Sequence, residues 1–150
     1  MVVVREIEAA DHKAWKPLWD GYNAFYGREG PTALPDEITQ TTWHRFLNAE
    51  EPVFALVATI DAKIVGIAHF LYHRNTTGLE LTCYLQDLFT LPKARGQGIG
   101  RALIQAIYTR AEADGIGRVY WHTQESNKAG RLLYDKVAEH AGFIVYSHKL

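Results

Sequence analysis

The chain has 150 residues, of which 47% are hydrophobic and 22% are charged, and its formal net charge is −1. This composition predicts a single globular domain over residues 1–150, long enough to bury a continuous core. No apolar run approaches the roughly 20 residues that cross a bilayer, so we expect no membrane partner. The near-neutral charge leaves no basic stripe for phosphates, which argues against nucleic acid as a partner.

The single cysteine, Cys83, excludes an internal disulfide. The first residues lack the basic-then-apolar layout of a signal peptide and instead predict a strand over residues 2–7. Both observations favour a cytoplasmic protein.

The first helix is predicted from an apolar pattern that follows Asp11, its expected cap. The apolar side chains recur at the i, i+3, i+4, i+7 spacing: Trp15, Leu18, Trp19, Tyr22, and Phe25 or Tyr26. Residues 27–35 predict a loop because glycine and proline interrupt the pattern. A second helix is predicted from about Asp36 to Leu47.

The middle of the chain predicts strands. Val53–Ile60 and Lys63–His73 are predicted to form a hairpin about the turn at Asp61 and Ala62. Another turn, at residues 75–78, leads into a strand over Leu79–Leu91.

The last third alternates helices and strands: a helix from Ile99 that ends at Gly115, a strand over Arg118–Thr123, a helix over 127–141 and a closing strand over Phe143–Lys149. The predicted order β-α-α-β-β-β-α-β-α-β gives an α/β fold, a mixed sheet with helices on both faces.

Three alternate glycines separate the strand ending at Leu91 from the helix that follows: Gly96, Gly98 and Gly100. Glycine permits tight bends and the close approach of a ligand. The unpaired amides that open the helix form an anion site, most naturally for phosphate. Arg95 and Arg101 add positive charge on either side. The segment therefore predicts a ligand that carries a diphosphate.

The glycine spacing excludes two familiar phosphate loops. A P-loop requires a Gly-Lys-Ser/Thr that is absent here, and a dinucleotide fingerprint requires glycine where Arg101 or Leu103 stands. The pattern present is Arg-x-x-Gly-x-Gly, which begins at Arg95. It resembles the acetyl-CoA loop of the GCN5-related N-acetyltransferase (GNAT) family. The alternative, a plain glycine-rich turn, is less favoured because a strand, an arginine and a helix accompany the glycines.

The resemblance implies the GNAT acyl-CoA N-acyltransferase fold and acetyl-CoA as co-substrate. In that fold the strands over Leu79–Leu91 and Arg118–Thr123 splay apart, and the pantetheine arm lies between them. The implied cofactor-binding residues in the strand and loop are Leu88, Phe89, Thr90, Arg95, Gly96, Gln97, Gly98, Ile99, Gly100 and Arg101.

A second segment, Glu125–Tyr134, predicts a helix start with Ser126 or Asn127 as cap. Asn127 and Tyr134 share one helix face, about 10 Å apart along the axis. The family places an asparagine against pantetheine and a tyrosine near the thioester sulfur, so the resemblance implies cofactor binding for both. It also makes Tyr134 the candidate acid for the leaving thiolate. By itself, Tyr134 would be an ordinary half-buried tyrosine.

The resemblance is closest to the small histone and polyamine acetyltransferases, on residues 84–88, 119–127 and 142–146. It implies direct attack of an amine on the thioester in a ternary complex. The acceptor would be a small-molecule primary amine, polyamine or amino-acid-like, or a peptide lysine. A backbone amide near Leu88 is the candidate oxyanion donor. The seven histidines lack a metal-ligand spacing, so no metal is expected.

The general base is the open point. Polyamine-acetylating relatives carry a glutamate where this chain has Gln86, and an amide does not take a proton at neutral pH. Asp87 is expected to face the opposite side of the strand, since side chains alternate. Substitutes are water or one of four side chains: Glu80, His69, His122 and Glu125. Because Gln86 cannot act as a base, two alternative functions stay open: a CoA-binding sensor and an interaction domain with the same fold.

Substrate contacts are expected from Gln86 and from two aromatic residues at the end of the first helix, Tyr22 and Tyr26. Trp15 and Trp19 are expected in the helix core. Asp20 and Glu29 would either add negative charge near the acceptor or be solvated. The closing strand and its aromatics predict a homodimer.

Overall fold

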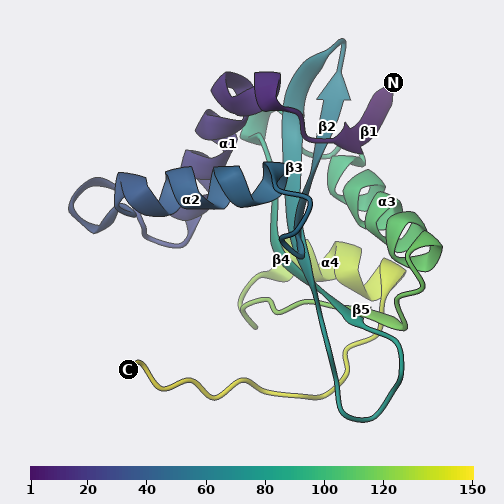
Figure 1. Ribbon diagram of the computed structural model, residues 1–150. Helices are drawn as coiled ribbons and strands as arrows, with labels where there is room; N and C mark the ends of the chain where they lie inside the picture. Colours follow the sequence, from purple (N-terminus) through teal and green to yellow (C-terminus); the bar gives the residue numbers. More distant parts are fainter.

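The computed structural model describes residues 1–150 and shows a five-stranded sheet with helices on both faces (Figure 1). The elements, in chain order, are β1 (Val2–Glu6), α1 (His12–Phe25), α2 (Asp36–Leu47), β2 (Val53–Ile60), β3 (Lys63–His73), β4 (Thr82–Thr90), α3 (Ile99–Ala113), β5 (Arg118–Tyr120) and α4 (Lys128–Val137). No helix is both long and apolar enough to cross a membrane. The predicted mixed α/β fold is confirmed.

The strands lie side by side in the order in which they occur in the chain. Neighbours from β1 to β4 are antiparallel, whereas β4 and β5 are parallel and are connected through α3. Asp61 and Ala62, between β2 and β3, have left-handed φ values of 49° and 63°. This turn suits the twist of a two-residue hairpin, and the predicted hairpin is confirmed.

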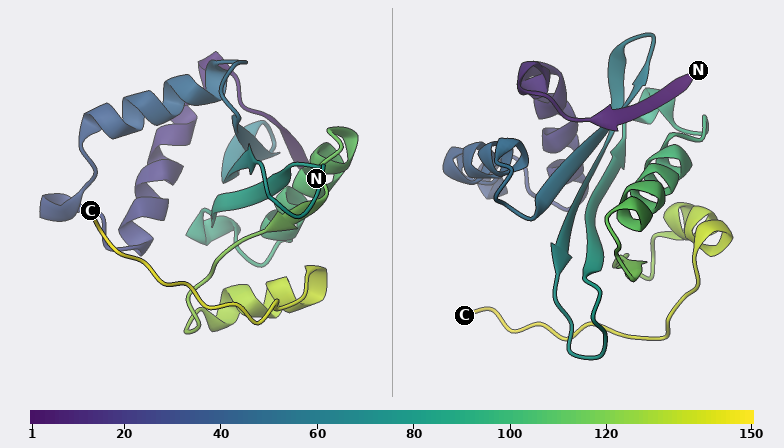
Figure 2. Two further views of the ribbon diagram at one scale, coloured as in Figure 1. Left: turned by 60° about the horizontal axis from the view of Figure 1, so that its bottom comes forward. Right: turned by 45° about the vertical axis from the view of Figure 1, so that its right-hand side comes forward.

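Two apolar cores lie on opposite faces of the sheet. The right-hand view of Figure 2 shows α1 and α2 on one face and α3 and α4 on the other. Under α1 and α2, Trp15 and Trp43 pack against Val57 and Ile67. Under α3 the core includes Phe70, Leu85, Leu103, Ile104 and Ile107. Because alternate side chains of each strand point to opposite faces, β2 and β3 contribute to both cores.

Asp11 holds the start of α1, but not as the expected side-chain cap. Its carboxylate accepts two hydrogen bonds from the Arg5 guanidinium, at 2.7 and 2.9 Å, and one from the Glu8 amide at 2.8 Å. These contacts lower the pKa of Asp11, and the hydrogen bonds from Arg5 have the largest effect. The carboxylate therefore ties β1 to the entrance of the helix.

β4 and β5 diverge, as the resemblance to the family implies. They pair only from Thr82 to Tyr84 on β4 and from Arg118 to Tyr120 on β5. Both strands are shorter than expected, since β4 begins at Thr82 rather than Leu79 and β5 ends before Thr123. Beyond Tyr84, β4 keeps its neighbour β3 but has no paired strand on its other side.

A β-bulge interrupts β4 within this unpaired stretch. His69 on β3 faces Asp87, but the next residue, Phe70, faces Leu85, so Gln86 is an extra residue on β4. A bulge breaks the strict alternation of side chains. The expectation that Asp87 faces away from the Gln86 side is therefore wrong, as the cavity above β4 shows below.

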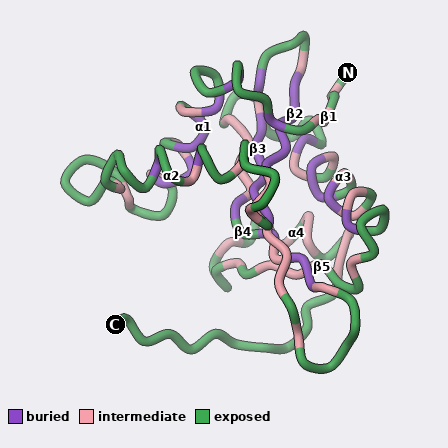
Figure 3. Tube along the Cα trace, viewed as in Figure 1, coloured by how far each residue is buried: buried purple, intermediate pink, exposed green.

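The predicted closing strand is wrong. Residues 138–150 contain no helix or strand, and α4 ends at Val137 rather than at residue 141. Figure 3 shows this tail exposed along most of its length. Phe143 is 83% exposed and Tyr146 is 90% exposed. The apolar and β-branched residues of the tail have strand propensity, but a strand also needs a partner, and the tail pairs with none of the five strands.

Candidate active site

Two of the three loop glycines bend the backbone between β4 and α3. Gly96 and Gly98 have left-handed φ values of 78° and 79°, and Gly98 is the residue that caps α3. A side chain added at either position would meet no atom within 4 Å, so the space above the loop is open to a ligand. The first amides of α3 have no partner within the helix and carry the positive end of its dipole.

The third glycine has a different role. Gly100 lies inside α3, and a Cβ there would be 3.3 Å from Cδ2 of Leu133 on α4. It therefore lets α4 approach α3 closely beside the loop.

A cavity of about 580 Å³ lies along this loop, and we call it the loop cleft. It brings together residues from β4, the loop, α3 and α4 that are far apart in the sequence. All the predicted cofactor-binding residues except Gln97 line it: Leu88, Phe89, Thr90, Arg95, Gly96, Gly98, Ile99, Gly100, Arg101, Asn127 and Tyr134.

Arg95 is held against the end of β4. Its Nε donates to the Thr90 carbonyl at 3.3 Å, and its guanidinium lies 5.7 Å from the centre of the Phe89 ring. Arg101 is exposed on the first turn of α3. Positive charge and free amides therefore face the same cleft.

Asn127 is the N-cap of α4, as predicted. Its Oδ1 accepts from the Gly130 amide at 3.2 Å, and its Nδ2 donates to Thr123 Oγ1 at 3.0 Å. A Cβ at Gly130 would be 2.5 Å from Asn127 Nδ2, so glycine allows this cap to form. The cap fixes the start of the helix that carries Tyr134.

Tyr134 lines one side of the loop cleft. Its ring packs edge-on against the ring of Trp121, with 5.4 Å between the two ring centroids. Burial raises the pKa of Tyr134, with a smaller contribution from Tyr26. Its hydroxyl consequently keeps its proton throughout the neutral range.

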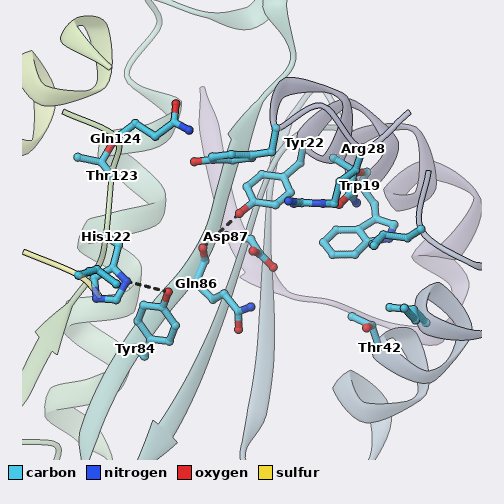
Figure 4. Close-up of a pocket in the computed structure, with 15 residues that line it drawn as sticks. Trp19, Tyr22, Arg28, Thr42, Tyr84, Gln86, Asp87, His122, Thr123 and Gln124 are labelled. Atoms are coloured by element: carbon cyan, nitrogen blue, oxygen red, sulfur yellow. Dashed lines mark hydrogen bonds between the residues drawn. The ribbon is translucent and has the colours of Figure 1, made fainter. Parts of the chain in front are cut away.

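A second cavity of about 650 Å³ lies over the bulge of β4, and we call it the bulge pocket (Figure 4). Figure 4 shows α1 with its following loop on one side, β4 in the middle and the segment after β5 on the other. Tyr22 and Tyr26, the two aromatic residues expected to contact the substrate, line both this pocket and the loop cleft. The two cavities therefore meet at these tyrosines.

The floor of the bulge pocket holds a carboxylate. Asp87 lines the pocket together with Gln86, although it is only 7% exposed. The two side chains reach the same pocket because of the bulge. Alternation along β4 concealed this, and no signal in the sequence marks the bulge.

Asp87 ends a buried chain of hydrogen bonds that begins in the helix core. Trp15 Nε1 donates to His69 Nε2 at 3.0 Å, and His69 Nδ1 lies 2.8 Å from Asp87 Oδ2. Because an indole N–H only donates, Nε2 accepts and the proton on Nδ1 is donated to Asp87. This chain orients the carboxylate and occupies one of its oxygens.

Gln86 has an exposed side chain in the bulge pocket, and its carbonyl accepts from the Tyr22 hydroxyl at 3.4 Å. Burial, followed by the charge of Asp87, raises the pKa of Tyr22 far above its usual range. Tyr22 is therefore a neutral hydroxyl next to Asp87.

The other candidate bases are differently placed. His69 is buried in the core, and Glu80 and Glu125 are exposed outside both cavities. His122 lines the bulge pocket, with Nδ1 3.4 Å from the Tyr84 hydroxyl.

Of the two acidic residues expected near the acceptor, Asp20 pairs with Lys16, and neither Asp20 nor Glu29 lines the bulge pocket. No group of three or more His, Cys, Asp or Glu side chains is arranged to hold a metal ion.

Known proteins similar to this chain are acetyltransferases. The acetyltransferase (GNAT) family profile matches residues 15–138. The chain is 35% identical to the D-amino-acid N-acetyltransferase HPA3 of Saccharomyces cerevisiae, over 97% of this chain and 89% of that protein. It is 29% identical to a thialysine N-epsilon-acetyltransferase of Caenorhabditis elegans over 57% of this chain and 52% of that one.

Solved structures share the fold. The aminoglycoside acetyltransferase AAC(6')-Iy, in complex with a bisubstrate analogue of CoA, superposes with a TM-score of 0.84 at 18% identity. The superposition covers 100% of this chain and 99% of that one. At this identity the similarity concerns the fold.

Proposed function

Because this chain belongs to the GNAT acetyltransferase family, we propose that it transfers the acetyl group of acetyl-CoA to the primary amine of a small molecule. One observation carries the proposal: a cleft with an anion cradle and a pocket with a carboxylate floor meet at Tyr22 and Tyr26. A donor in the cleft and an acceptor in the pocket would be adjacent there.

The loop cleft suits CoA in shape and charge. The open space above Gly96 and Gly98, the amides of α3 and the arginines Arg95 and Arg101 would hold the diphosphate. The unpaired side of β4 at Leu88–Thr90 would bind the pantetheine amides as a strand does. When bound, acetyl-CoA supplies the acetyl group as a thioester.

We propose that Asp87 accepts the proton of the attacking amine. It is the carboxylate at the floor of the bulge pocket, and His69 holds one of its oxygens so that the other can face the acceptor. Gln86, which stands where polyamine-acetylating relatives carry glutamate, would then contact the acceptor through its amide. Proton transfer of this kind contributes about 10²–10⁴ to a rate.

The remaining roles fall to groups in the loop cleft. The Leu88 amide, on the unpaired side of β4, would donate to the developing oxyanion. The Tyr134 hydroxyl, kept protonated by its raised pKa, would protonate the departing thiolate. Direct attack then gives one amide and one thiol, in a ternary complex and without a covalent enzyme intermediate.

A small acceptor is favoured over a peptide lysine. The pocket volume of about 650 Å³ is in the range of small-molecule sites. The named substrates of the yeast and nematode relatives, a D-amino acid and thialysine, are also small amines.

The test is release of CoA thiol from acetyl-CoA with polyamines, D- and L-amino acids, aminoglycosides and lysine-rich peptides. Turnover with one class of small amine supports the proposal, and turnover with the peptides alone would assign a different acceptor. Binding of acetyl-CoA without any turnover would instead identify a CoA-binding sensor.

We also propose a homodimer. The exposed apolar tail and the outer edge of β5, which has no neighbouring strand, would be covered by the corresponding parts of a second copy. Sedimentation is expected to give twice the chain mass, and a monomer at micromolar concentration would refute this.

A further inference from the structure

We propose that Arg28 binds the carboxylate of the acceptor, so that the bulge pocket selects amino acids over amines without an acid group. The inference rests on the proposed function and narrows its acceptor. Arg28 follows α1, and its side chain lines the bulge pocket beside Tyr22 (Figure 4).

The backbone places Arg28 through the turn that ends α1. Gly27 adopts a left-handed φ of 77°, and its amide donates to the Ala24 carbonyl at 3.0 Å. The amide of Arg28 donates back to the Asn23 carbonyl at 2.9 Å. This pair of bonds is the Schellman motif. It brings Arg28 back over the last turn of α1.

The guanidinium of Arg28 is held through Nε, whereas its two η nitrogens are free to donate. Arg28 Nε donates to Asn23 Oδ1 at 2.7 Å, and Asn23 is buried, with its Nδ2 bonded to the Trp19 carbonyl at 2.9 Å. The guanidinium lies 5.8 Å and 5.4 Å from the ring centres of Tyr22 and Tyr26. Neither η nitrogen of Arg28 has an acceptor. Two parallel donors on a fixed guanidinium match a carboxylate in the bidentate geometry.

The charge of Arg28 is uncompensated within the protein. None of the five ion pairs includes it. It is the only lysine or arginine that lines the bulge pocket, and Asp87, the only carboxylate there, already pairs with His69. The neighbouring Glu29 caps the next turn and lies outside the pocket.

Tyr22 lies next to both charged groups. Its ring contacts Arg28, and its hydroxyl lies near Asp87. A ligand with an amine at Asp87 and an acid group at Arg28 would match both. An amino acid has this charge pattern, whereas a polyamine would bring a further cation to Arg28.

The test compares phenylalanine, as both enantiomers, with phenethylamine, which has the same ring and chain without the carboxylate. For the wild type we expect kcat/KM for one or both enantiomers at least 30-fold above that for phenethylamine. Arg28→Gln should lower the amino-acid value 10- to 100-fold, mainly through KM, and leave phenethylamine within 3-fold. Arg28→Lys keeps the charge but not the two parallel N–H donors, so its kcat/KM for the amino acid should lie between those of the wild type and Arg28→Gln. Arg45→Gln, which removes an exposed arginine on α2, is the control.

Equal losses for phenylalanine and phenethylamine in Arg28→Gln would overturn the inference, because they would indicate a structural role. Equal wild-type rates for acid and amine would also overturn it, while leaving the acetyltransferase activity established. Calorimetric binding of phenylalanine separates the two proposals further. Binding that depends on Arg28 without any turnover would uphold the carboxylate site and refute the proposed function.

Discussion

The loop cleft and the bulge pocket are built from different parts of the polypeptide. The proposed anion cradle of the cleft comes from one continuous segment, in which left-handed glycines lead into the unpaired first amides of α3. The pocket is lined by side chains from α1 and the loop after it, from α2, from β4, from the segment after β5 and from the C-terminal tail. Its acid group depends on a one-residue bulge.

The two sites therefore place different requirements on the sequence. Backbone amides can bind a diphosphate with almost any side chains, provided that the backbone takes the right shape. A pocket of side chains sets which acceptor binds and where its proton goes, and each group needs its own support. The cleft should therefore be sensitive to backbone strain, and the pocket to single functional groups.

The largest effect is expected from Asp87→Asn, which removes the proposed proton acceptor and retains an oxygen for His69. We expect kcat to fall about 10³-fold, within the range of general-base catalysis, with KM for acetyl-CoA unchanged. Steady-state kinetics with the best acceptor measures both values.

Gln86→Ala is the matched control, since it removes a neighbouring side chain that cannot act as a base. It should lower kcat less than 10-fold. A larger loss from Gln86→Ala than from Asp87→Asn would refute the role of Asp87 as proton acceptor and leave it a structural residue.

Tyr134→Phe should cost about 10²-fold in kcat, the lower end of the range for a proton donor. Because burial raises the pKa of Tyr134, its proton is present at neutral pH and is lost only as the pH rises through the raised value. The wild-type rate should therefore show no loss assignable to this hydroxyl below about pH 10, the ordinary tyrosine value. An alkaline decline in the wild type near neutrality that disappears in Tyr134→Phe would contradict the assignment.

Gly98→Ala tests the backbone of the cleft. A residue with a side chain resists the left-handed conformation by about 1–2 kcal/mol, so the loop should shift and KM for acetyl-CoA should rise about 10-fold. Gly115→Ala, at the other end of α3 with φ of 71°, imposes a similar strain away from the cleft. Both variants should lose similar stability in denaturant unfolding, but only Gly98→Ala should change KM.

Sequence patterns predicted most of the fold because the patterns concern local properties. The helical periodicity of Trp15 to Tyr22, the breakers after α1 and the turn at Asp61 act over a few residues. The loop from Arg95 to Arg101 is equally local, and the structure brings nearly all the residues predicted around it to one cleft. Their roles in binding stay predictions.

What the sequence did not predict depends on partners distant in the chain. The bulge at Gln86 arises from the register of β4 against β3, and it reverses the expected direction of Asp87. The predicted closing strand is wrong for the same reason, since residues 143–149 have strand propensity but pair with no strand of the sheet. Arg28 was missed because its position depends on the turn after α1 and on Asn23.

The smallest effect on activity is expected from Trp15→Phe, which tests how far the support of the bulge pocket extends into the core. The change removes the donor to His69 Nε2 and leaves a buried acceptor unsatisfied, at a cost of about 1–3 kcal/mol in the free energy of unfolding. His69 could then carry its proton on either nitrogen, so Asp87 would lose part of its orientation. We expect kcat to fall about 3-fold.

Trp43→Phe is the control that isolates this hydrogen bond. Trp43 is buried in the same core, 4.9 Å from Trp15 between ring centroids, but the indole that donates to His69 Nε2 is that of Trp15. The two variants delete the same volume, so a difference between them measures the bond to His69. If Trp15→Phe lowers kcat more than Trp43→Phe, and adds nothing in an Asp87→Asn background, the chain from Trp15 acts through the carboxylate. Equal kcat values for Trp15→Phe and Trp43→Phe would mean that only His69 orients Asp87. The hydrogen bond from Trp15 to His69 would then contribute to stability alone.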